Sequence, residues 1–115
     1  MCQLIIPLVK KPLLVPAEQI IRVEASSNYS YVFFVDGKKL LVSKILTWFE
    51  ERLPVGMFAR VHRSHLINTA FISEIIESGS CSLLLQNGDR IELSRRKKTD
   101  FINNYRQLHP VGGDN

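Results

Sequence analysis

The sequence has only two cysteines and no long apolar run, and both absences narrow the class of protein. Cys2 and Cys81 cannot build a disulfide framework, so a reducing compartment is expected. No apolar segment approaches the roughly 20 residues that a membrane-spanning helix needs. Lys10 and Lys11 follow the first apolar stretch, whereas the basic residues of a signal peptide precede it. We therefore expect a cytoplasmic protein.

Catalytic and metal-binding motifs are also missing. The sequence contains no convincing acid pair, no glycine-rich phosphate loop and no nucleophile elbow. His62 and His65 stand three residues apart, but they supply only two metal ligands and no third ligand lies nearby. An enzyme would need a concave pocket with perturbed titratable groups, for which the sequence gives no sign. We expect no enzyme activity, no cofactor, no metal and no small-molecule substrate.

Positive charge, by contrast, is abundant and unevenly placed. The 115 residues include 15 Lys and Arg against 11 Asp and Glu, which gives a net charge of +4 and a pI near 9.3. A domain this basic is a candidate for nucleic-acid binding. Five of the cations lie between Arg90 and Lys98, and four of them are consecutive. The length predicts a single domain.

Apolar alternation and tight-turn signals predict a mainly β fold with antiparallel sheets. Asp36-Gly37 and Asn87-Gly88 are hairpin signals, because such pairs favour two-residue turns between strands. In the strand over 20–25, Arg22 and Glu24 are expected to face outward. The expected strands cover residues 4–8, 13–15, 20–25, 29–35, 38–42, 57–62, 71–77, 81–85 and 90–94.

Two helices are expected, besides one helical turn over 16–19. Ser43 can cap the first, which runs to Leu53 and is stopped by Pro54. Ser94 can cap the second, which packs onto a sheet through its apolar face. The apolar face of the first helix comprises Ile45, Trp48, Phe49 and Leu53, and that of the second comprises Phe101, Tyr105 and Leu108.

The segment over 58–72 places polar and cationic side chains between two apolar anchors, and its polar middle cannot be core. Arg63 stands in this polar middle. Its planar fork can pair with guanine O6 and N7, or with a phosphate, in a way that lysine cannot. The alternative for Arg63 is an ion pair with Glu50 or Glu51.

Four other polar side chains of this segment have expected structural roles. Arg60 should pack its stem and pair its head with a carboxylate. His62 should be partly buried and should order the turn. Ser64 is expected to cap a short turn at Leu66-Ile67, and Asn68 to bond the backbone.

Four consecutive cations stand where the second helix is expected to begin: Arg95, Arg96, Lys97 and Lys98. A helix N-terminus carries partial positive charge, so these residues have the wrong sign there. An approaching phosphate would satisfy the cations and the free N–H groups together. The alternative is a solvated surface run, the usual fate of such runs. At a helix start we favour binding.

The turn between the strands over 20–25 and 29–35 supplies two more candidates. Asn28 can pair with an adenine edge, and Tyr29 can donate a hydrogen bond to a phosphate. A plain turn with a solvated tyrosine fits the sequence equally well.

The run Phe58-x-Arg60-Val61-His62-Arg63-Ser64-x-Leu66-Ile67-Asn68 resembles the signature of the LytTR family of bacterial DNA-binding domains. Ile21-x-Val23-Glu24-Ala25 and Ile91-x-Leu93-Ser94-Arg95-Arg96 resemble two further blocks of that family, in the same order and spacing. The resemblance implies an elongated β fold that inserts loops into successive major grooves of DNA. The family's contact positions fall on Asn28 and Tyr29, on Arg63 and Ser64, and on Arg96 and Lys97.

The resemblance also implies a partner and an organisation. Members of the family are bacterial transcriptional regulators that usually bind paired direct repeats as two molecules, often behind a receiver domain or membrane helices. Only about 15 residues precede the matching region here, so no receiver domain is expected within the chain. Residues 1–15 would form short strands of the same domain, residues 16–109 the LytTR-like domain and residues 110–115 a flexible tail.

Together these features predict sequence-specific binding of double-stranded DNA, with a homodimer on paired repeats as a further expectation. Arg63 and Arg96 would read bases or fix register. The competing class is a protein-interaction module that keeps the fold but turns its basic face to an acidic partner. The expected DNA-binding residues are Asn28, Tyr29, Arg63, Ser64, Arg95, Arg96, Lys97 and Lys98, of which Ser64, Lys97 and Lys98 would hold phosphates.

Overall fold

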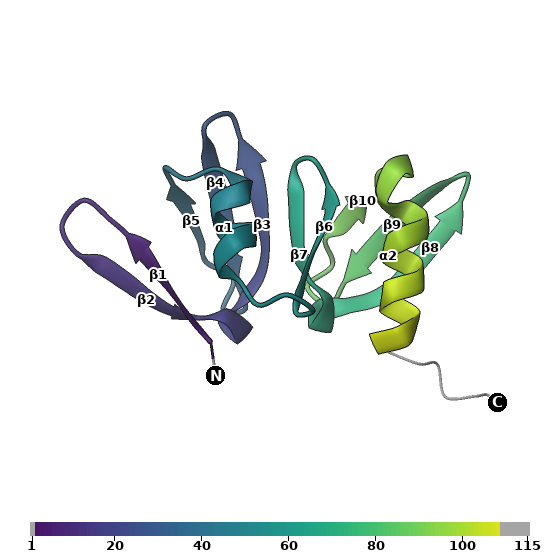
Figure 1. The fold of residues 1–115 in the computed structure, drawn as a ribbon, viewed down its shortest axis with the longest axis horizontal. Helices are drawn as coiled ribbons and strands as arrows, with labels where there is room; N and C mark the ends of the chain where they lie inside the picture. The colour runs from purple at the N-terminus through teal and green to yellow at the C-terminus, as the bar shows by residue number, and fades with distance from the viewer. Residues whose placement is uncertain (1, 109–115) are drawn as a thin grey trace.

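The structure, a computed structural model, describes residues 2–108 and confirms a mainly β fold with two helices (Figure 1). Nothing is described for the expected tail over 110–115. The strands are β1 (Gln3–Pro7), β2 (Pro12–Pro16), β3 (Ile20–Ser26), β4 (Tyr29–Phe34), β5 (Lys39–Val42), β6 (Phe58–His62), β7 (His65–Asn68), β8 (Ile72–Ser78), β9 (Ser80–Leu85) and β10 (Arg90–Glu92). The helices are α1 (Leu46–Arg52) and α2 (Arg95–Leu108), with 3₁₀ turns at Ala17–Gln19 and Thr69–Phe71.

The strands form three sheets that follow one another along the molecule. A β1-β2 hairpin comes first, then a five-stranded sheet in the order β5-β4-β3-β7-β6, then a three-stranded sheet in the order β10-β9-β8. All strand pairs within these sheets are antiparallel, as predicted. Figure 1 shows this succession from one end to the other, and the extents of 52 × 30 × 24 Å confirm an elongated shape.

Two apolar cores lie on opposite faces of the five-stranded sheet. One joins the β1-β2 hairpin and α1 to one face of the sheet, with Val23 and Leu66 among its members. The other joins α2 and the three-stranded sheet to the opposite face, through Ile21, Val61 and Ile67. Because the central sheet is covered on both faces, it fixes the two halves of the molecule relative to each other.

Strand β7 was not predicted, and the expected turn at Leu66-Ile67 capped by Ser64 is wrong. Leu66 and Ile67 are 1% and 0% exposed and point into the two different cores. A strand buried on both faces shows no alternation of polar and apolar residues, which is the pattern that identifies a strand in sequence. The β7 strand pairs with both β3 and β6 and so joins the first half of the chain to the second.

Helix α1 begins at Leu46, two residues later than a cap at Ser43 predicts. The Ser30 hydroxyl donates a hydrogen bond of 2.6 Å to the carbonyl of Lys44, which holds this residue outside the helix. Ile45 becomes the capping residue without a side-chain cap. Its side chain is 53% exposed, so the predicted apolar face is wrong at this position. The buried face consists of Leu46, Phe49 and Leu53, with Trp48 partly buried.

Arg22 is buried, contrary to the expectation that it faces outward. Its guanidinium lies 3.8 Å from the centre of the Phe33 ring and pairs with Asp89 at 2.9 Å and Glu24 at 2.6 Å. Asp89 belongs to the turn between β9 and β10, in the other half of the molecule. The outward position in β3 is thus covered by a neighbouring turn, which no pattern within residues 20–25 records.

Several other predictions of local structure are confirmed. The helical turn predicted over 16–19 is present as a 3₁₀ turn at Ala17–Gln19, and Ile91 and Leu93 are both buried, on the same face, as predicted. The Ser94 hydroxyl oxygen accepts the N–H of Lys97 at 3.3 Å, as a helix cap does. Phe101 is buried in α2, while the side chain of Leu108 is outside the description. Among residues 2–108, no helix is both long and apolar enough to cross a membrane.

Candidate nucleic-acid interface

Three polar segments meet along one edge of the molecule: the turn between β3 and β4, the turn between β6 and β7, and the start of α2. Figure 1 places all three at the upper edge. The Ala25 N–H donates to the Ser64 carbonyl at 2.9 Å, which joins the first turn to the second. The Ser94 N–H donates to the Val61 carbonyl at 2.9 Å, which joins the second turn to α2. We call residues 26–29, 63–64 and 94–98 the rim.

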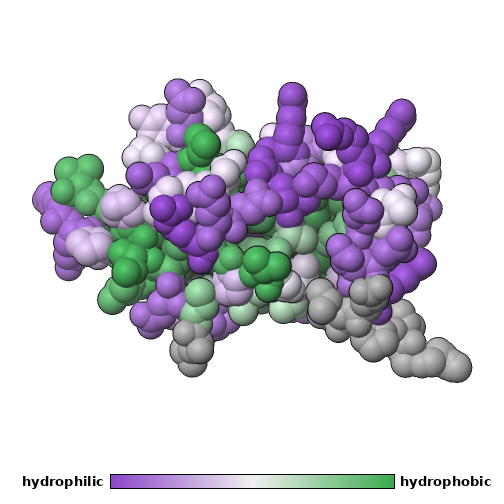
Figure 2. All heavy atoms as spheres, viewed as in Figure 1, coloured by the Kyte–Doolittle hydropathy of each residue, from purple (hydrophilic) through white to green (hydrophobic). Residues whose placement is uncertain are grey.

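The rim is polar, whereas the end of the molecule formed by the β1-β2 hairpin exposes several apolar side chains. In Figure 2 hydrophilic residues cover the upper edge above β6, β7 and α2, and hydrophobic residues gather at the end formed by the β1-β2 hairpin. Exposed apolar side chains on that hairpin include Ile5, Val9 and Leu14. The rim and the hairpin therefore present different chemistry to a partner, and the rim is the better match for an acceptor-rich one.

The first turn places its two predicted residues in solvent. Asn28 is exposed, and within residues 2–108 its side chain makes no hydrogen bond. Tyr29 is 47% exposed. Ser27 adopts a φ of 56°, the left-handed region that non-glycine residues seldom enter, so the turn is tight. Both candidates remain available for contact with a ligand.

The second turn leaves Arg63 free, because the two acidic residues considered as its partners are otherwise engaged. Glu50 pairs with Arg60 at 2.9 Å, and Glu51 lies 3.6 Å from Arg52. Arg63 itself is exposed and has no carboxylate partner among the described residues. The expected pairing of Arg60 with a carboxylate is confirmed.

Internal hydrogen bonds hold the backbone around Arg63. The Arg60 guanidinium donates to the carbonyls of His62 and Arg63, at 3.1 and 2.7 Å. The Ser64 N–H donates to Nδ1 of His62 at 3.1 Å, so His62 orders the turn as predicted. Asn68 bonds the backbone at both ends of its amide, also as predicted. The turn is thus shaped before any ligand arrives.

The third segment carries the four predicted cations at the first turn of α2. Arg95, Arg96 and Lys97 are exposed and form no ion pair with any described residue. Lys98 is half-buried, and its Nζ lies 3.7 Å from the Glu77 carboxylate. Three unpaired cations at a helix N-terminus repel one another and the helix dipole, and a bound anion would relieve both effects.

Comparison with known proteins assigns the family. A family model described as the LytTr DNA-binding domain matches residues 10–105. The chain belongs to the LytTR family of DNA-binding domains. The sensory transduction protein LytT of Bacillus subtilis (strain 168) is 39% identical over 56 residues, which are 47% of this chain and 23% of LytT. This LytTR domain therefore spans much less than the length of that relative.

The fold agrees with the family. A solved LytTr DNA-binding domain, from a Bacillus cereus protein described as a methyl-accepting/DNA response regulator, superposes with a TM-score of 0.74. The match covers 94% of this LytTR domain and 96% of that chain at 24% identity. At such identity the likeness concerns the fold alone.

A polar hollow of about 570 Å³ adjoins the rim of this LytTR domain, and sequence reasoning missed it. It lies where the turn between β8 and β9 approaches the start of α2 and the β6-β7 turn. Gly79 and Ser80 line it together with His62, Arg95 and Lys98. The sequence Ser78-Gly79 signals a turn, but only the sheet order brings that turn to the same edge (Figure 1).

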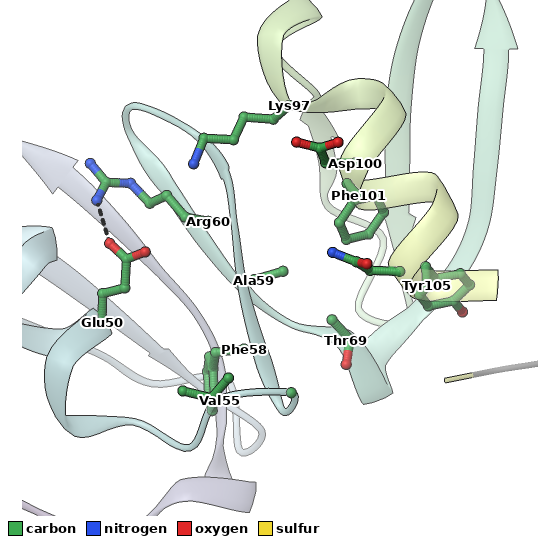
Figure 3. Close-up of a pocket in the computed structure, with 12 residues that line it drawn as sticks. Glu50, Val55, Phe58, Ala59, Arg60, Thr69, Lys97, Asp100, Phe101 and Tyr105 are labelled. Atoms are coloured by element: carbon green, nitrogen blue, oxygen red, sulfur yellow. Dashed lines mark hydrogen bonds and ion pairs between the residues drawn. The ribbon is translucent and has the colours of Figure 1, made fainter. Parts of the chain in front are cut away.

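A second hollow of about 480 Å³ lies between α1 and α2, over β6 (Figure 3). Phe58 and Ala59 form its floor, and Phe101 lies on the α2 side. Figure 3 shows Glu50 reaching from α1 toward Arg60, with Lys97 extending from α2 above them. Within residues 2–108, no cluster of three or more His, Cys, Asp or Glu side chains has the arrangement of a metal site.

His65, at the start of β7, is a partly buried histidine with a perturbed pKa. Burial lowers the pKa of His65 below its ordinary value of 6.5, with Arg22 and His62 acting in the same direction and Glu24 opposing them. Its Nδ1 atom is buried, without a hydrogen-bond partner among the described residues. The unfolded chain takes up a proton at this residue near pH 6.5, whereas the folded chain does so only at lower pH.

The free energy of unfolding is therefore expected to fall as the pH drops from 6.5 toward the folded-state pKa of His65. In the variant His65→Gln this contribution disappears, so the loss between pH 7.5 and 5.5 should be smaller. Urea unfolding of both proteins at several pH values measures the difference. Parallel pH profiles for the two proteins would contradict the assignment to His65.

Proposed function

We propose that this LytTR domain binds double-stranded DNA sequence-specifically, by inserting the turns of the rim into the major groove, and thereby regulates bacterial transcription in the cytoplasm. The observation that carries the proposal is the convergence of three segments, far apart in sequence, on one edge with unpaired cations. Phosphate contacts supply most of the affinity of such an interface, while base-edge contacts supply its selectivity.

Each rim residue has a proposed role. Arg63 and Arg96 read base edges or fix register, since a guanidinium matches guanine O6 and N7 bidentately. Asn28 pairs with an adenine edge. The phosphate contacts come from Tyr29, Ser64, Arg95, Lys97 and Lys98. The ion pair of Lys98 with Glu77 is half-exposed and weak, so it can be exchanged for a phosphate.

Two copies of the domain are proposed to occupy paired direct repeats. The alternative function is docking of an acidic protein on the same basic rim. Both functions are electrostatic, so salt dependence alone does not separate them.

Selection of duplexes from a random library, followed by competition, tests the proposal. A selected duplex should displace a labelled copy of itself far better than a scrambled duplex of equal length and composition. Specific binding typically exceeds non-specific binding by about 10³-fold or more. Equal displacement by both duplexes would overturn sequence-specific recognition and favour the acidic protein partner.

Lys97 provides a test of the phosphate contacts. The change Lys97→Ala should weaken selected and scrambled duplexes about equally, because a phosphate contact carries no sequence information. The slope of log affinity against log salt should flatten by about one unit. Fluorescence anisotropy titrations at several salt concentrations measure both effects. Lys10→Ala, an exposed cation in the turn of the distant hairpin, is the matched control and should leave the slope unchanged.

A further inference from the structure

The side chain of Arg60 joins the Arg63 turn to helix α1 through three hydrogen bonds. Nε donates to the carbonyl of His62 at 3.1 Å, and Nη2 donates to the carbonyl of Arg63 at 2.7 Å. Nη1 donates to Oε1 of Glu50 at 2.9 Å. Figure 3 shows this last contact, with Glu50 coming from α1, which is not part of the rim.

We propose that Arg60 and Glu50 are positioning residues that determine sequence discrimination by Arg63, although neither is proposed to touch DNA. The inference rests on the proposed function of the rim. Bidentate recognition of a base edge requires the guanidinium of Arg63 to be placed accurately, and its placement follows from the backbone that Arg60 holds. Glu50 fixes the rotamer of Arg60 and therefore the position of both carbonyl contacts.

The pair has a second effect, which concerns charge. The Glu50 carboxylate and the Arg63 carbonyl bind the same guanidinium, so an acid lies close to the turn that carries the reading arginine. The side chain of Glu50 is 45% exposed. Without Arg60, Glu50 is free to pair with Arg63 or to repel a phosphate. Arg60 thus has two effects: it positions Arg63, and it keeps Glu50 from pairing with Arg63.

Lysine cannot replace Arg60 in this role. A guanidinium presents donors in fixed planar directions, and here three of them reach three different acceptors. A lysine ammonium is a compact charge on a flexible stem. It can neutralise Glu50 but cannot hold the carbonyls of both His62 and Arg63 in the same geometry. The variant Arg60→Lys therefore separates the charge effect from the positioning effect.

Anisotropy titrations with a selected and a scrambled duplex test the proposal. The change Arg60→Gln should reduce the preference for the selected duplex about tenfold, as expected for losing charged hydrogen bonds. The double change with Glu50→Gln should recover part of that preference, because no free carboxylate remains to capture Arg63. Arg60→Lys should lose preference but keep the affinity for the scrambled duplex. The salt slope should stay unchanged in all three.

Glu51→Gln is the matched control, since Glu51 is on the same helix, is 66% exposed, and among residues 2–108 pairs only with Arg52, at 3.6 Å. It should alter neither preference nor slope. A preference in Arg60→Gln equal to that of the unchanged protein would overturn the proposal. So would a double variant no better than Arg60→Gln alone, because Glu50 would then have no independent effect on Arg63.

A measurement without DNA separates this proposal from the proposed function. Hydrogen exchange of the backbone amides over 62–64 should quicken in Arg60→Gln and Arg60→Lys, while amides of β3 and β4 keep their protection. If the turn loosens in this way but the unchanged protein does not discriminate between duplexes, the function fails while the anchoring stands. Unchanged exchange in both variants would overturn the anchoring itself, whatever the domain binds.

Discussion

Replacing Arg22 by methionine is expected to lower the free energy of unfolding by about 3 kcal/mol. Breaking a buried ion pair costs roughly 3–5 kcal/mol. The lower end applies here because the Asp89 and Glu24 side chains keep 35% and 37% exposure and can be partly hydrated, whereas that of Arg22 is 9% exposed. Methionine retains an unbranched stem over the Phe33 ring, so the effect isolates the lost charge.

Urea unfolding monitored by the fluorescence of Trp48 measures this change. Arg90→Met is the matched control, because Arg90 lies in an exposed strand position and forms no ion pair with any of residues 2–108. Its effect should stay within about 0.5 kcal/mol. A loss below about 1 kcal/mol for Arg22→Met would show that the contacts between β3 and the turn at Asp89 contribute little to holding the two halves together.

Removing the side chain of Arg63 is expected to have the largest effect on DNA recognition. The change Arg63→Ala should cost about 1–3 kcal/mol of binding free energy on a selected duplex and relax the preference at the base pair it reads. Binding to a scrambled duplex should weaken much less. The physical reason is that a bidentate contact to a base edge is lost, while most phosphate contacts remain.

Two further variants sharpen this test. Arg63→Lys keeps the charge but lacks the planar fork, so it should bind scrambled DNA normally and still discriminate poorly. Arg106→Ala removes an exposed cation near the C-terminal end of α2, away from the rim, and should leave discrimination intact. Full discrimination by Arg63→Ala would assign base reading to another residue.

Turn chemistry was the most informative local feature of the sequence. The pairs Asp36-Gly37 and Asn87-Gly88 predicted hairpins, and both are present, with Gly37 and Gly88 at φ of 90° and 93°. These are left-handed conformations that glycine adopts without strain. Together with alternating strands, such turns were enough to predict antiparallel sheets and most strand boundaries.

The errors share one cause, which is contact with elements distant in the sequence. Arg22 sits on a face that reads as solvent-exposed until the turn at Asp89 covers it. Strand β7 is buried on both faces and so lacks alternation. The start of α1 shifted because Ser30, on another strand, holds the carbonyl of Lys44. No local pattern contains this information.

In the candidate site too, local features could be predicted from the sequence and long-range contacts could not. Charge, residue type and family resemblance singled out the three segments of the rim. Their adjacency depends on long-range hydrogen bonds, from Ala25 to Ser64 and from Ser94 to Val61. The anchoring of the Arg63 turn by Glu50 and Arg60 was likewise not predicted. The roles of the rim residues in DNA contact stay predictions.

The central claim is that the three segments of the rim bind DNA together. Backbone amide NMR of the labelled domain, titrated with a selected and a scrambled duplex, tests this claim most directly. With the selected duplex, the largest shift changes should fall on all three segments, residues 26–29, 63–64 and 94–98. The scrambled duplex should produce weaker changes that disappear at higher salt. Changes centred on the β1-β2 hairpin, or identical responses to both duplexes, would contradict the account.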